Sequence, residues 1–294
     1  MNVLMVTGDK KFGPGNLRYD LQKSAVDELT VVYWGRESMF PKVPDGKFDV
    51  VTAQDPFWRG LFAYRASRTL GAKLNVQVHA DLYGQSFVKS ILAPFVLRRA
   101  NSVRVVSEKI KQQVKDFGVC VPITVLPVYV DAAKFQNVVR QPHKSILWIG
   151  RFEAEKNPGA AIEVLKRVRA LGVDAKLILL GSGRLDAHLK VLAGGLPVEF
   201  PGWQDPVGYL GSAGVVLSTS WHESWGQSIV EALAAGVPVV TPDVGIAKEA
   251  GAIVVERKDL AKEVVRVLQA GTRGELKIKL LSASEWAKQW KENL

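Results

Sequence analysis

Two basic residues in one short loop are the first candidates for chemistry. Arg151 and Lys156 follow an apolar segment, 145–149, and Gly150 opens the loop. Arginine can hold a diphosphate through two parallel hydrogen bonds while lysine adds a point charge, so the pair suits a diphosphate ligand. The alternative is a solvated loop in which the two cations pair with the two glutamates that lie between them.

A second candidate site contains two glutamates, Glu223 and Glu231, with seven residues between them. A helix is predicted to begin within this interval, and its first N–H groups, at Gly226, Gln227 and Ser228, have no carbonyl of a preceding turn to bond. Such groups bind phosphate oxygens or sugar hydroxyls. A carboxylate one turn inside the helix, as at Glu231, can accept two vicinal hydroxyls such as those of a ribose. The alternative is a capping glutamate followed by an ordinary surface glutamate.

The elements that must position these residues alternate along the chain. Short segments rich in Val, Ile and Leu, typical of buried parallel strands, predict strands at 3–7, 29–33, 50–52, 74–78, 102–106, 123–125, 145–149, 176–180, 198–200, 214–218, 238–241 and 252–254. Helices are predicted between many of them, at 17–26, 59–69, 109–117, 158–171, 228–235 and 261–270. This alternation favours parallel sheets with helices on both faces.

The same pattern restarts in the second half of the chain. A polar stretch, 134–144, which contains Pro142, is interpreted as the linker. We therefore expect two doubly wound α/β domains, at 1–138 and 139–280, with a cleft between the carboxyl ends of their strands. The chain has 294 residues, enough for two domains that each bury a hydrophobic core.

Composition limits the class of protein. Hydrophobic residues make up 47% and charged residues 23% of the sequence, which excludes a disordered or fibrous chain. The single cysteine excludes an internal disulfide, and the four histidines show no metal-site spacing. The first residues predict a buried strand rather than a secretion signal, and no apolar run reaches the ~20 residues that span a bilayer. We therefore expect a cytoplasmic protein.

The positive charge lies mostly in the first half of the chain. Residues 1–140 hold 20 Lys and Arg against 12 Asp and Glu. Their net charge is therefore +8, and that of the whole chain is +10. This excess implies an anionic partner, and nucleic acid, an anionic membrane surface and a phosphorylated substrate all fit. The segment 56–68 mixes aromatic and basic residues. It predicts either a packed helix with a solvated basic face or an interfacial helix on anionic lipid, which Arg98, Arg99 and 109–115 would extend.

Several segments, taken in order, resemble one family. The run 218–243 is similar to the signature of family 4 retaining glycosyltransferases, and 150–156 and the glycine turn 181–183 resemble two further segments of that family. Shorter matches lie at 52–57, 76–81, 105–108, 126–131, 200–203 and 284–287. The resemblance implies the α/β fold called GT-B, with two doubly wound Rossmann-like domains, an interdomain cleft and a C-terminal helix, 281–294, that crosses back to the first domain.

The resemblance also implies roles for individual residues. Arg151 and Lys156 would bind the diphosphate of a nucleotide-sugar donor, Glu231 its ribose, and Glu223 the hydroxyls of the transferred sugar. His79 aligns with the active-site histidine of the first domain, so the implied catalytic set is His79, Arg151, Lys156 and Glu223. The other implied donor-binding residues are Gly13, Gly15, Gly150, Trp225, Gly226, Gln227 and Ser228.

The implied activity is a retaining transfer of a hexosyl group from a UDP- or GDP-linked sugar to a hydroxyl of a saccharide or lipid-linked acceptor. No metal or other cofactor is implied, because the sequence holds no Asp-x-Asp pair and a helix N-terminus with two cations can replace a divalent ion. The glycine turns at 13–15 and 181–183 lack the third glycine of a dinucleotide fingerprint, which excludes a nicotinamide oxidoreductase.

Other classes of function stay open at this point. A non-catalytic protein on the same fold, binding an anionic ligand or nucleic acid, fits the basic first half, although no recognised nucleic-acid motif supports it and we expect no nucleic-acid partner. A phosphorylase would need a pyridoxal-binding lysine or a sugar-phosphate donor. A peripheral contact with the cytoplasmic face of an anionic membrane is compatible with the glycosyltransferase interpretation.

Overall fold

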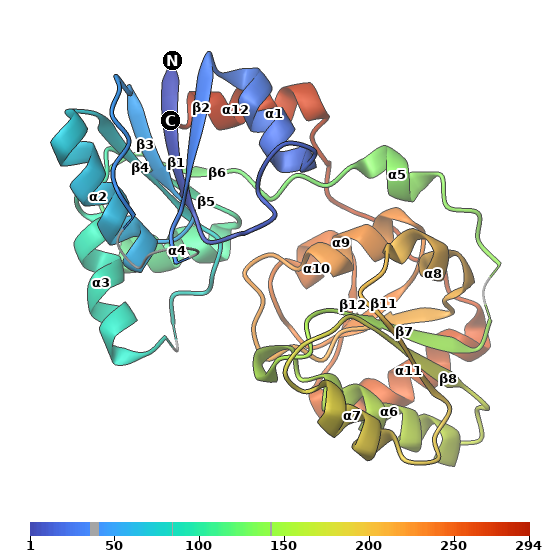
Figure 1. Ribbon diagram of the computed structural model, residues 1–294. Coiled ribbons are helices and arrows are strands. Elements are labelled where there is room, and N and C mark those ends of the chain that lie inside the picture. The colour runs from blue at the N-terminus through green and yellow to red at the C-terminus, as the bar shows by residue number, and fades with distance from the viewer. Residues whose placement is uncertain (36–40, 84, 142) are drawn as a thin grey trace. The chain divides into compact units, whose positions relative to one another are not determined.

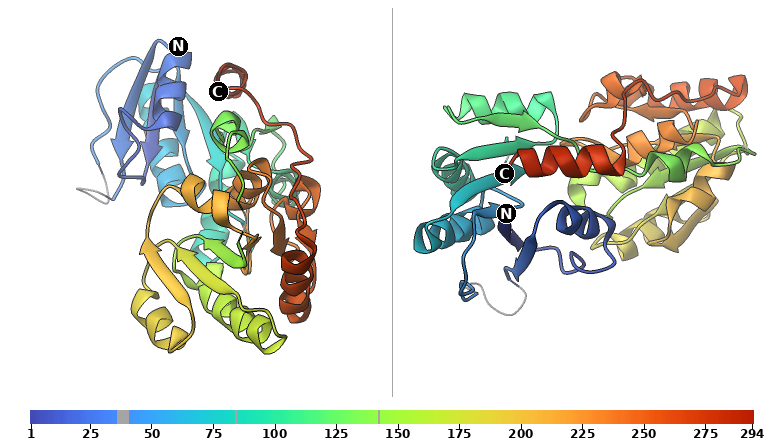
Figure 2. Two further views of the ribbon diagram at one scale, coloured as in Figure 1. Left: turned by 90° about the vertical axis from the view of Figure 1, so that its right-hand side faces the viewer. Right: turned by 90° about the horizontal axis from the view of Figure 1, so that it is seen from above.

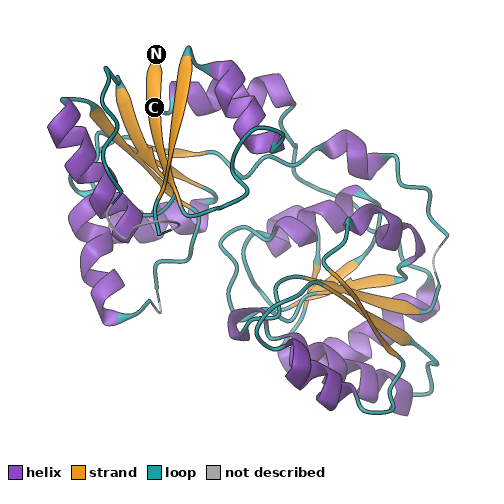
Figure 3. Ribbon diagram, viewed as in Figure 1, coloured by secondary structure: helices purple, strands orange, loops and turns teal. Residues whose placement is uncertain are grey.

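The chain forms two α/β units in the computed structural model, which describes residues 1–35, 41–83, 85–141 and 143–294 (Figure 1). The first unit comprises Met1–Tyr129 and Leu281–Leu294, and the second comprises Val130–Leu280. In each unit helices cover both faces of a parallel sheet, which is the expected arrangement (Figure 3).

The first unit is built on a parallel sheet with the strand order β2-β1-β3-β4-β5-β6 in the part of the chain that the structure describes. The strands are β1 (Asn2–Thr7), β2 (Glu28–Tyr33), β3 (Val50–Ala53), β4 (Lys73–Val78), β5 (Ser102–Val105) and β6 (Ile123–Val125). The strand order reverses direction between β1 and β3. In open α/β sheets, ligands bind beyond the carboxyl ends of the strands at such a switch point.

The helices of the first unit include one from the far end of the sequence. They are α1 (Leu17–Ala25), α2 (Trp58–Leu70), α3 (Phe87–Leu97), α4 (Glu108–Asp116) and α12 (Ala283–Glu292). Trp286 and Trp290 of α12 are buried against Val3 and Met5 of β1, and the Trp286 indole N–H donates to the Pro127 carbonyl at 2.8 Å. The expected return of the C-terminal helix to the first unit is therefore confirmed, and both chain ends lie there (Figure 2).

The second unit has a parallel sheet with the order β12-β11-β10-β7-β8-β9. Its strands are β7 (Ser145–Ile149), β8 (Lys176–Leu180), β9 (Val198–Gly202), β10 (Val215–Leu217), β11 (Val239–Thr241) and β12 (Ile253–Val254). Read from the β9 edge, this is the 3-2-1-4-5-6 order of nucleotide-binding sheets. The switch point lies between β7 and β10, so the loops after these two strands are where a ligand is expected.

Helices on both faces of this second sheet complete the unit. The α-helices are α5 (Ala132–Gln136), α6 (Pro158–Ala170), α7 (Asp186–Ala193), α8 (Pro206–Ser212), α9 (Gln227–Ala234), α10 (Ala247–Ala250) and α11 (Leu260–Ala270). Two single-turn 3₁₀ helices are η1 (Ala154–Lys156) and η2 (Arg257–Asp259). A hydrophobic core cluster joins α6, α7 and α11 to β7 and β8, and Trp148 and Phe152 are buried in it.

The stretch 134–144 is not simply a linker, and this part of the interpretation is wrong. The Asp131 side chain accepts a hydrogen bond from the Lys134 N–H and caps α5, which packs against α9. Phe135 is buried in that contact, so the second unit begins at Val130 rather than at 139. The stretch is polar on average, but it contains one apolar residue, Phe135, that packs in the core. Pro142 lies outside the described residues.

Candidate functional site

A cavity of about 610 Å³ opens in the second unit at the switch point of its sheet. Its wall includes Ile149 and Gly150 at the end of β7, Leu180 at the end of β8, and Glu223 in the loop after β10. The remaining lining residues are Lys134, Phe135, Arg151, Lys156, Trp203, Gln204, Asp205, Pro206, Gln227, Ser228 and Glu231. The volume is typical of small-molecule sites, and six of the lining residues are charged, namely Lys134, Arg151, Lys156, Asp205, Glu223 and Glu231.

The loop after β7 brings two cations to this cavity. Phe152 is buried and anchors the loop in the core, while Arg151 remains exposed and pairs with Glu155 at 2.8 Å. Lys156 ends the turn η1, and Asn157 then adopts a left-handed φ of 50° before Pro158 begins α6. The alternative of cations paired within the loop therefore holds for Arg151 but not for Lys156, whose partner lies elsewhere.

The glycine turn after β8, residues 181–183, packs against the loop after β7. A Cβ on Gly181 would lie 1.8 Å from the Gly150 carbonyl oxygen, and one on Gly183 would lie 2.6 Å from that of Phe152. The Gly150 N–H donates to Leu180 and the Phe152 N–H to Ser182, at 3.1 and 2.9 Å. Glycine is therefore required because the two loops meet backbone to backbone.

We expect Gly181→Ala to lower the free energy of unfolding by roughly 2–4 kcal/mol, because the methyl group cannot fit without moving the Gly150 loop. Chemical denaturation measures this change. Gly195→Ala is the matched control, since nothing lies within 4 Å of its added Cβ. Equal stability of the two variants would contradict the proposed support of the loop.

An ion pair joins the two sequence motifs. Lys156 Nζ lies 2.6 Å from Glu223 Oε1, and the two side chains are only 21% and 14% exposed. The Ser220 hydroxyl donates to the same oxygen at 2.8 Å, and the Thr219 hydroxyl donates to the Asn157 carbonyl, also at 2.8 Å. A cation and an anion are thus held together at the cavity wall, although 67 positions separate them in sequence.

The N-terminus of α9 also faces the cavity. Gly226 precedes the helix with a φ of 98°, and its carbonyl accepts from the N–H groups of Ile229 and Val230. Gln227 and Ser228, the first two helical residues, line the cavity. The positive end of the helix and the N–H groups of its first turn make this wall favourable for an anion.

Glu231, one turn further along α9, is nearly buried at the cavity wall. Its side chain accepts a hydrogen bond from the Gln227 amide at 2.7 Å. Burial raises the pKa of the carboxyl to about 7, although the Gln227 hydrogen bond and the charge of Lys134 oppose the rise. Near neutral pH this group can therefore hold or release a proton, and a ligand that donates hydrogen bonds would favour the ionised form.

Trp225 does not line the cavity. Its side chain is 3% exposed, and its carbonyl accepts from the Ile246 N–H at 3.0 Å. A Cβ on Gly245 would lie 2.3 Å from that carbonyl oxygen, so the loop after β11 lies directly against it. Tertiary packing therefore places the indole in the core, and the expected role of Trp225 in donor binding stays a prediction.

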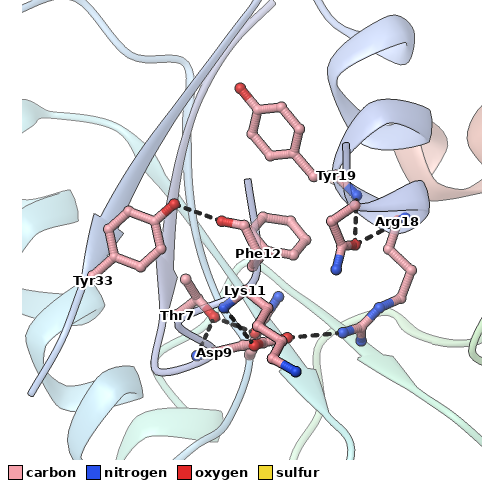
Figure 4. Close-up of polar contacts among 9 residues, drawn as sticks. Thr7, Asp9, Lys11, Phe12, Arg18, Tyr19 and Tyr33 are labelled. Carbon is pink, nitrogen blue, oxygen red and sulfur yellow. Dashed lines mark hydrogen bonds and ion pairs between the residues drawn. The ribbon is translucent and has the colours of Figure 1, made fainter. Parts of the chain in front are cut away.

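Three candidate residues belong to the first unit, and two of them, Gly13 and Gly15, lie in the loop between β1 and α1. The Tyr33 hydroxyl donates to the Phe12 carbonyl at 2.6 Å, and Arg18 pairs with Asp9 at 3.1 Å (Figure 4). Gly15 has a φ of 84°, which favours glycine. A hydrogen bond at Phe12 and an ion pair at Arg18 therefore hold the loop on either side of the two glycines.

His79, the third of these residues, follows β4. Its Nε2 lies 3.5 Å from a guanidinium nitrogen of Arg104, which is buried and donates to the carbonyls of Leu126 and Pro127. Burial, together with the charges of Arg104 and Arg18, holds the pKa of His79 well below its usual range. The imidazole is therefore neutral near neutral pH.

Sequence reasoning missed several residues of the cavity wall, chiefly Lys134, Phe135 and Asp205. Lys134 pairs with Asp205 at 2.7 Å across the cavity wall, and Trp203 beside them is exposed. Asp205 caps α8 by accepting from the Val207 N–H, with Pro206 in the first turn. That capping pattern was a readable signal for a helix start, whereas the pairing with Lys134 depends on where α5 packs.

Two features are absent from the described ranges, which are 1–35, 41–83, 85–141 and 143–294. No group of three or more His, Cys, Asp or Glu residues there could hold a metal ion. No helix within these same ranges has the length and apolar character needed to cross a membrane.

Comparison with known sequences shows what the second unit is similar to. Residues 143–270 match the family model described as Glycosyl transferases group 1. A GDP-mannose-dependent alpha-(1-6)-phosphatidylinositol dimannoside mannosyltransferase of Mycobacterium tuberculosis is 34% identical over 128 residues, 40% of this chain and 34% of that protein. A D-inositol 3-phosphate glycosyltransferase of an Arthrobacter species is 28% identical over 254 residues, 71% of this chain and 58% of that protein. The match to the mannosyltransferase thus spans about a third of its length.

Comparison with solved structures extends over the whole chain. HepE of Anabaena, crystallised with UDP and glucose, matches 99% of this chain and 95% of its own with a TM-score of 0.74 and 17% identity. Sucrose-phosphate synthase of Thermosynechococcus elongatus matches 100% of this chain and 94% of its own, with a TM-score of 0.72 and 15% identity. The chain therefore has the GT-B fold, and its residues 143–270 are similar to the family Glycosyl transferases group 1.

Proposed function

We propose that the chain is a retaining, metal-independent glycosyltransferase that moves a hexosyl group from a nucleoside diphosphate sugar to a hydroxyl of a saccharide or lipid-linked acceptor. The observation that carries this proposal is the Lys156–Glu223 pair at the wall of a cavity that also holds Arg151 and the N-terminus of α9. This arrangement offers positive charge for a diphosphate and a carboxylate for sugar hydroxyls within one site.

The proposed donor pose follows from the charges. The diphosphate lies against Arg151, Lys156 and the first N–H groups of α9, because these are the positive groups of the wall. The ribose hydroxyls donate to Glu231, which lies further along the same helix. Glu223 accepts from hydroxyls of the transferred sugar. GDP-mannose and UDP, named for two of the similar proteins, are donors or products of this chemical class.

The proposed reaction breaks the bond between the anomeric carbon and the diphosphate oxygen. Negative charge grows on the leaving diphosphate, and Arg151, Lys156 and the helix terminus stabilise it more in the transition state than in the bound donor. The acceptor hydroxyl attacks the oxocarbenium-like sugar from the face that the diphosphate leaves. Its proton passes to the departing phosphate, so the anomeric configuration is retained without a separate general base.

The first unit also contributes to the proposed activity. His79 stays in the proposed catalytic set, and Gly13 and Gly15 stay in the proposed donor-binding set, on the strength of their family resemblance. A neutral imidazole at His79 suits that role, because it can exchange hydrogen bonds with a sugar without adding charge.

A thermal-shift screen of UDP, GDP, ADP and CMP in the presence of EDTA tests donor binding. We expect one nucleoside diphosphate to raise the Tm selectively, since a ligand at 100 times its Kd stabilises the folded state by about 2.7 kcal/mol. The Glu231→Ala variant should lose most of this shift. No shift with any nucleotide at millimolar concentration, or a shift that requires metal, would overturn the proposed donor site.

A second experiment separates retention from inversion. Incubation with the sugar of the selected nucleotide and a panel of simple glycosides or lipids should yield a product with the donor's anomeric configuration, read from its NMR coupling constants. An inverted product would contradict the proposed mechanism while leaving the donor site intact.

A further inference from the structure

A row of large apolar side chains is exposed on one face of α3. Phe87, Ile91 and Phe95 follow one another at four-residue spacing and are 79%, 54% and 37% exposed, with Val88 beside them. The opposite face of the helix is also apolar and packs inside the first unit, through Ala93, Val96 and Leu97. An exposed apolar row of this length is not needed to fold the unit, so it indicates a contact with something else.

The segment that contains this row is rich in basic residues. Residues 58–101 contain seven Lys and Arg against one acidic residue. Within the described part of the chain, Arg65, Arg68, Lys73, Arg98 and Arg99 form no ion pair, whereas Arg59 on the same helix pairs with Asp55. Basic side chains without acidic neighbours favour an anionic partner.

A basic hollow adjoins the apolar row. A cavity of about 460 Å³ at the end of α2 and the start of β4 is lined by Arg68, Lys73 and Arg99, and none of its lining residues is acidic. The Arg99 guanidinium lies over the Phe95 ring, 3.8 Å from its centroid, and Tyr64 of α2 meets the same ring edge-on at 5.8 Å. The hollow and the apolar row therefore meet at Phe95, whose ring contacts two residues that line the hollow. The helices α2 and α3 are neighbours in the first unit (Figure 1).

We propose that this α2–α3 surface, made of Phe87, Val88, Ile91, Phe95, Arg68, Lys73 and Arg99, docks the chain on an anionic phospholipid membrane. The apolar row of α3 enters the boundary between headgroups and acyl chains, and the three cations meet lipid phosphates in the hollow. This inference stands apart from the proposed glycosyl transfer, because its residues lie on the first unit and line no part of the cavity at β7 and β10.

The location differs from the sequence-based expectation for 56–68. Helix α2 buries Gly60, Ala63, Ala66 and Ser67, and it exposes basic side chains and Trp58 but no row of apolar side chains. The apolar face comes instead from α3. A second copy of the chain fits the surface poorly, because a two-fold contact would bring the unpaired cations of each copy together.

Sedimentation with vesicles tests the apolar row. We expect the protein to sediment with vesicles of phosphatidylcholine containing about one-third phosphatidylglycerol, and Phe87→Ser/Ile91→Ser to lower the partition coefficient at least tenfold, since two apolar insertions are lost. Val139→Ser/Val191→Ser, which alters two exposed valines of the second unit, is the matched control and should bind like the original chain.

The cations are tested separately. Arg68→Gln/Lys73→Gln/Arg99→Gln should lower partitioning onto the anionic vesicles roughly a hundredfold, because each basic residue near such a surface contributes about a factor of ten or less. Arg167→Gln/Lys248→Gln/Lys262→Gln removes the same net charge from exposed positions of the second unit and should have a much smaller effect. Donor-induced thermal shifts of all variants should match the original chain, which keeps this test independent of the donor site.

Three outcomes would overturn the membrane proposal. One is no sedimentation of the original chain with anionic vesicles at low salt. Another is equal partitioning onto pure phosphatidylcholine. The third is a dimer in analytical ultracentrifugation that Phe87→Ser/Ile91→Ser converts to a monomer, which would assign the apolar row to contact between copies.

Discussion

Lys156→Ala should lower kcat for glycosyl transfer by about two to three orders of magnitude with a much smaller change in the donor KM. A fixed positive group aimed at a leaving diphosphate acts mainly on the transition state, and removal of one such donor typically costs 10²–10³ in kcat. The ammonium lies 2.6 Å from Glu223, so this ion pair holds it at the cavity wall. Steady-state kinetics with the nucleotide sugar selected by thermal shift measures the effect.

The effect of Lys156→Ala must be separated from the cost of leaving Glu223 without its cation. Glu223 is only 14% exposed, so loss of its partner also destabilises the loop after β10. Glu223→Gln in the same background removes the unpaired charge and should restore stability without restoring kcat. Lys166→Ala, on the exposed face of α6 and paired with Glu163, is the matched control and should leave kcat unchanged. A Lys156→Ala enzyme with normal kcat and raised KM would reduce this lysine to a binding role.

Glu231→Gln should have opposite effects on donor binding and on stability. The carboxylate is proposed to accept two ribose hydroxyls, and hydrogen bonds to a charged group contribute about 1.5–3 kcal/mol. The substitution should therefore raise the donor KM by roughly 10-fold to 100-fold with kcat largely kept. Gln227 still donates to the new amide oxygen, so the geometry of the wall is preserved.

The stability effect follows from the sign of the pKa change. Burial raises the pKa of Glu231 from 4.5 to about 7, so the folded state binds a proton that the unfolded chain has released. The resulting stabilisation is complete below pH 4.5 and is lost as the pH rises through 7. A shift of this size corresponds to about 3 kcal/mol. Glu231→Gln should therefore be more stable than the original chain at pH 8 and nearly equal to it at pH 4.5.

Two measurements check this pair of effects. Urea unfolding between pH 4.5 and 8 should show a smaller fall in stability for Glu231→Gln than for the original chain. Donor affinity of the original chain should weaken below pH 7, because the ribose hydroxyls bind the ionised carboxyl, and that part of the pH dependence should vanish in the variant. A variant that binds donor normally would remove Glu231 from the proposed ribose site.

The order of the elements follows from local patterns in the sequence. Each expected strand forms within two residues of its predicted bounds, and each expected helix within one, over the described residues. Strands of a buried parallel sheet are short apolar runs between glycine, proline and charged residues, and this signal needs no distant contact. Helix α3 was missed because it is apolar on most sides and contains Pro94, so it shows no clear helical period.

The candidate site likewise has some features that the sequence predicts and others that depend on tertiary packing. The loop of Arg151 and Lys156 and the N-terminus of α9 were predictable, because each directly follows a strand and so falls at the carboxyl edge of the sheet. The ion pair between Lys156 and Glu223 was not predictable, because it depends on which strands become neighbours in the sheet. The burial of Trp225 and the inclusion of α5 in the second unit depended equally on packing between segments far apart in sequence.

By itself, the sequence determined which segments become strands and helices and which charged residues reach the edge of the second sheet, because hydrophobic period and turn residues act locally. Only the tertiary structure decided that Lys156 meets Glu223, that Glu231 is buried enough to raise its pKa to about 7, and that one face of α3 stays exposed. Burial and pairing are properties of the packed chain, and they change with the neighbours that folding brings to each side chain.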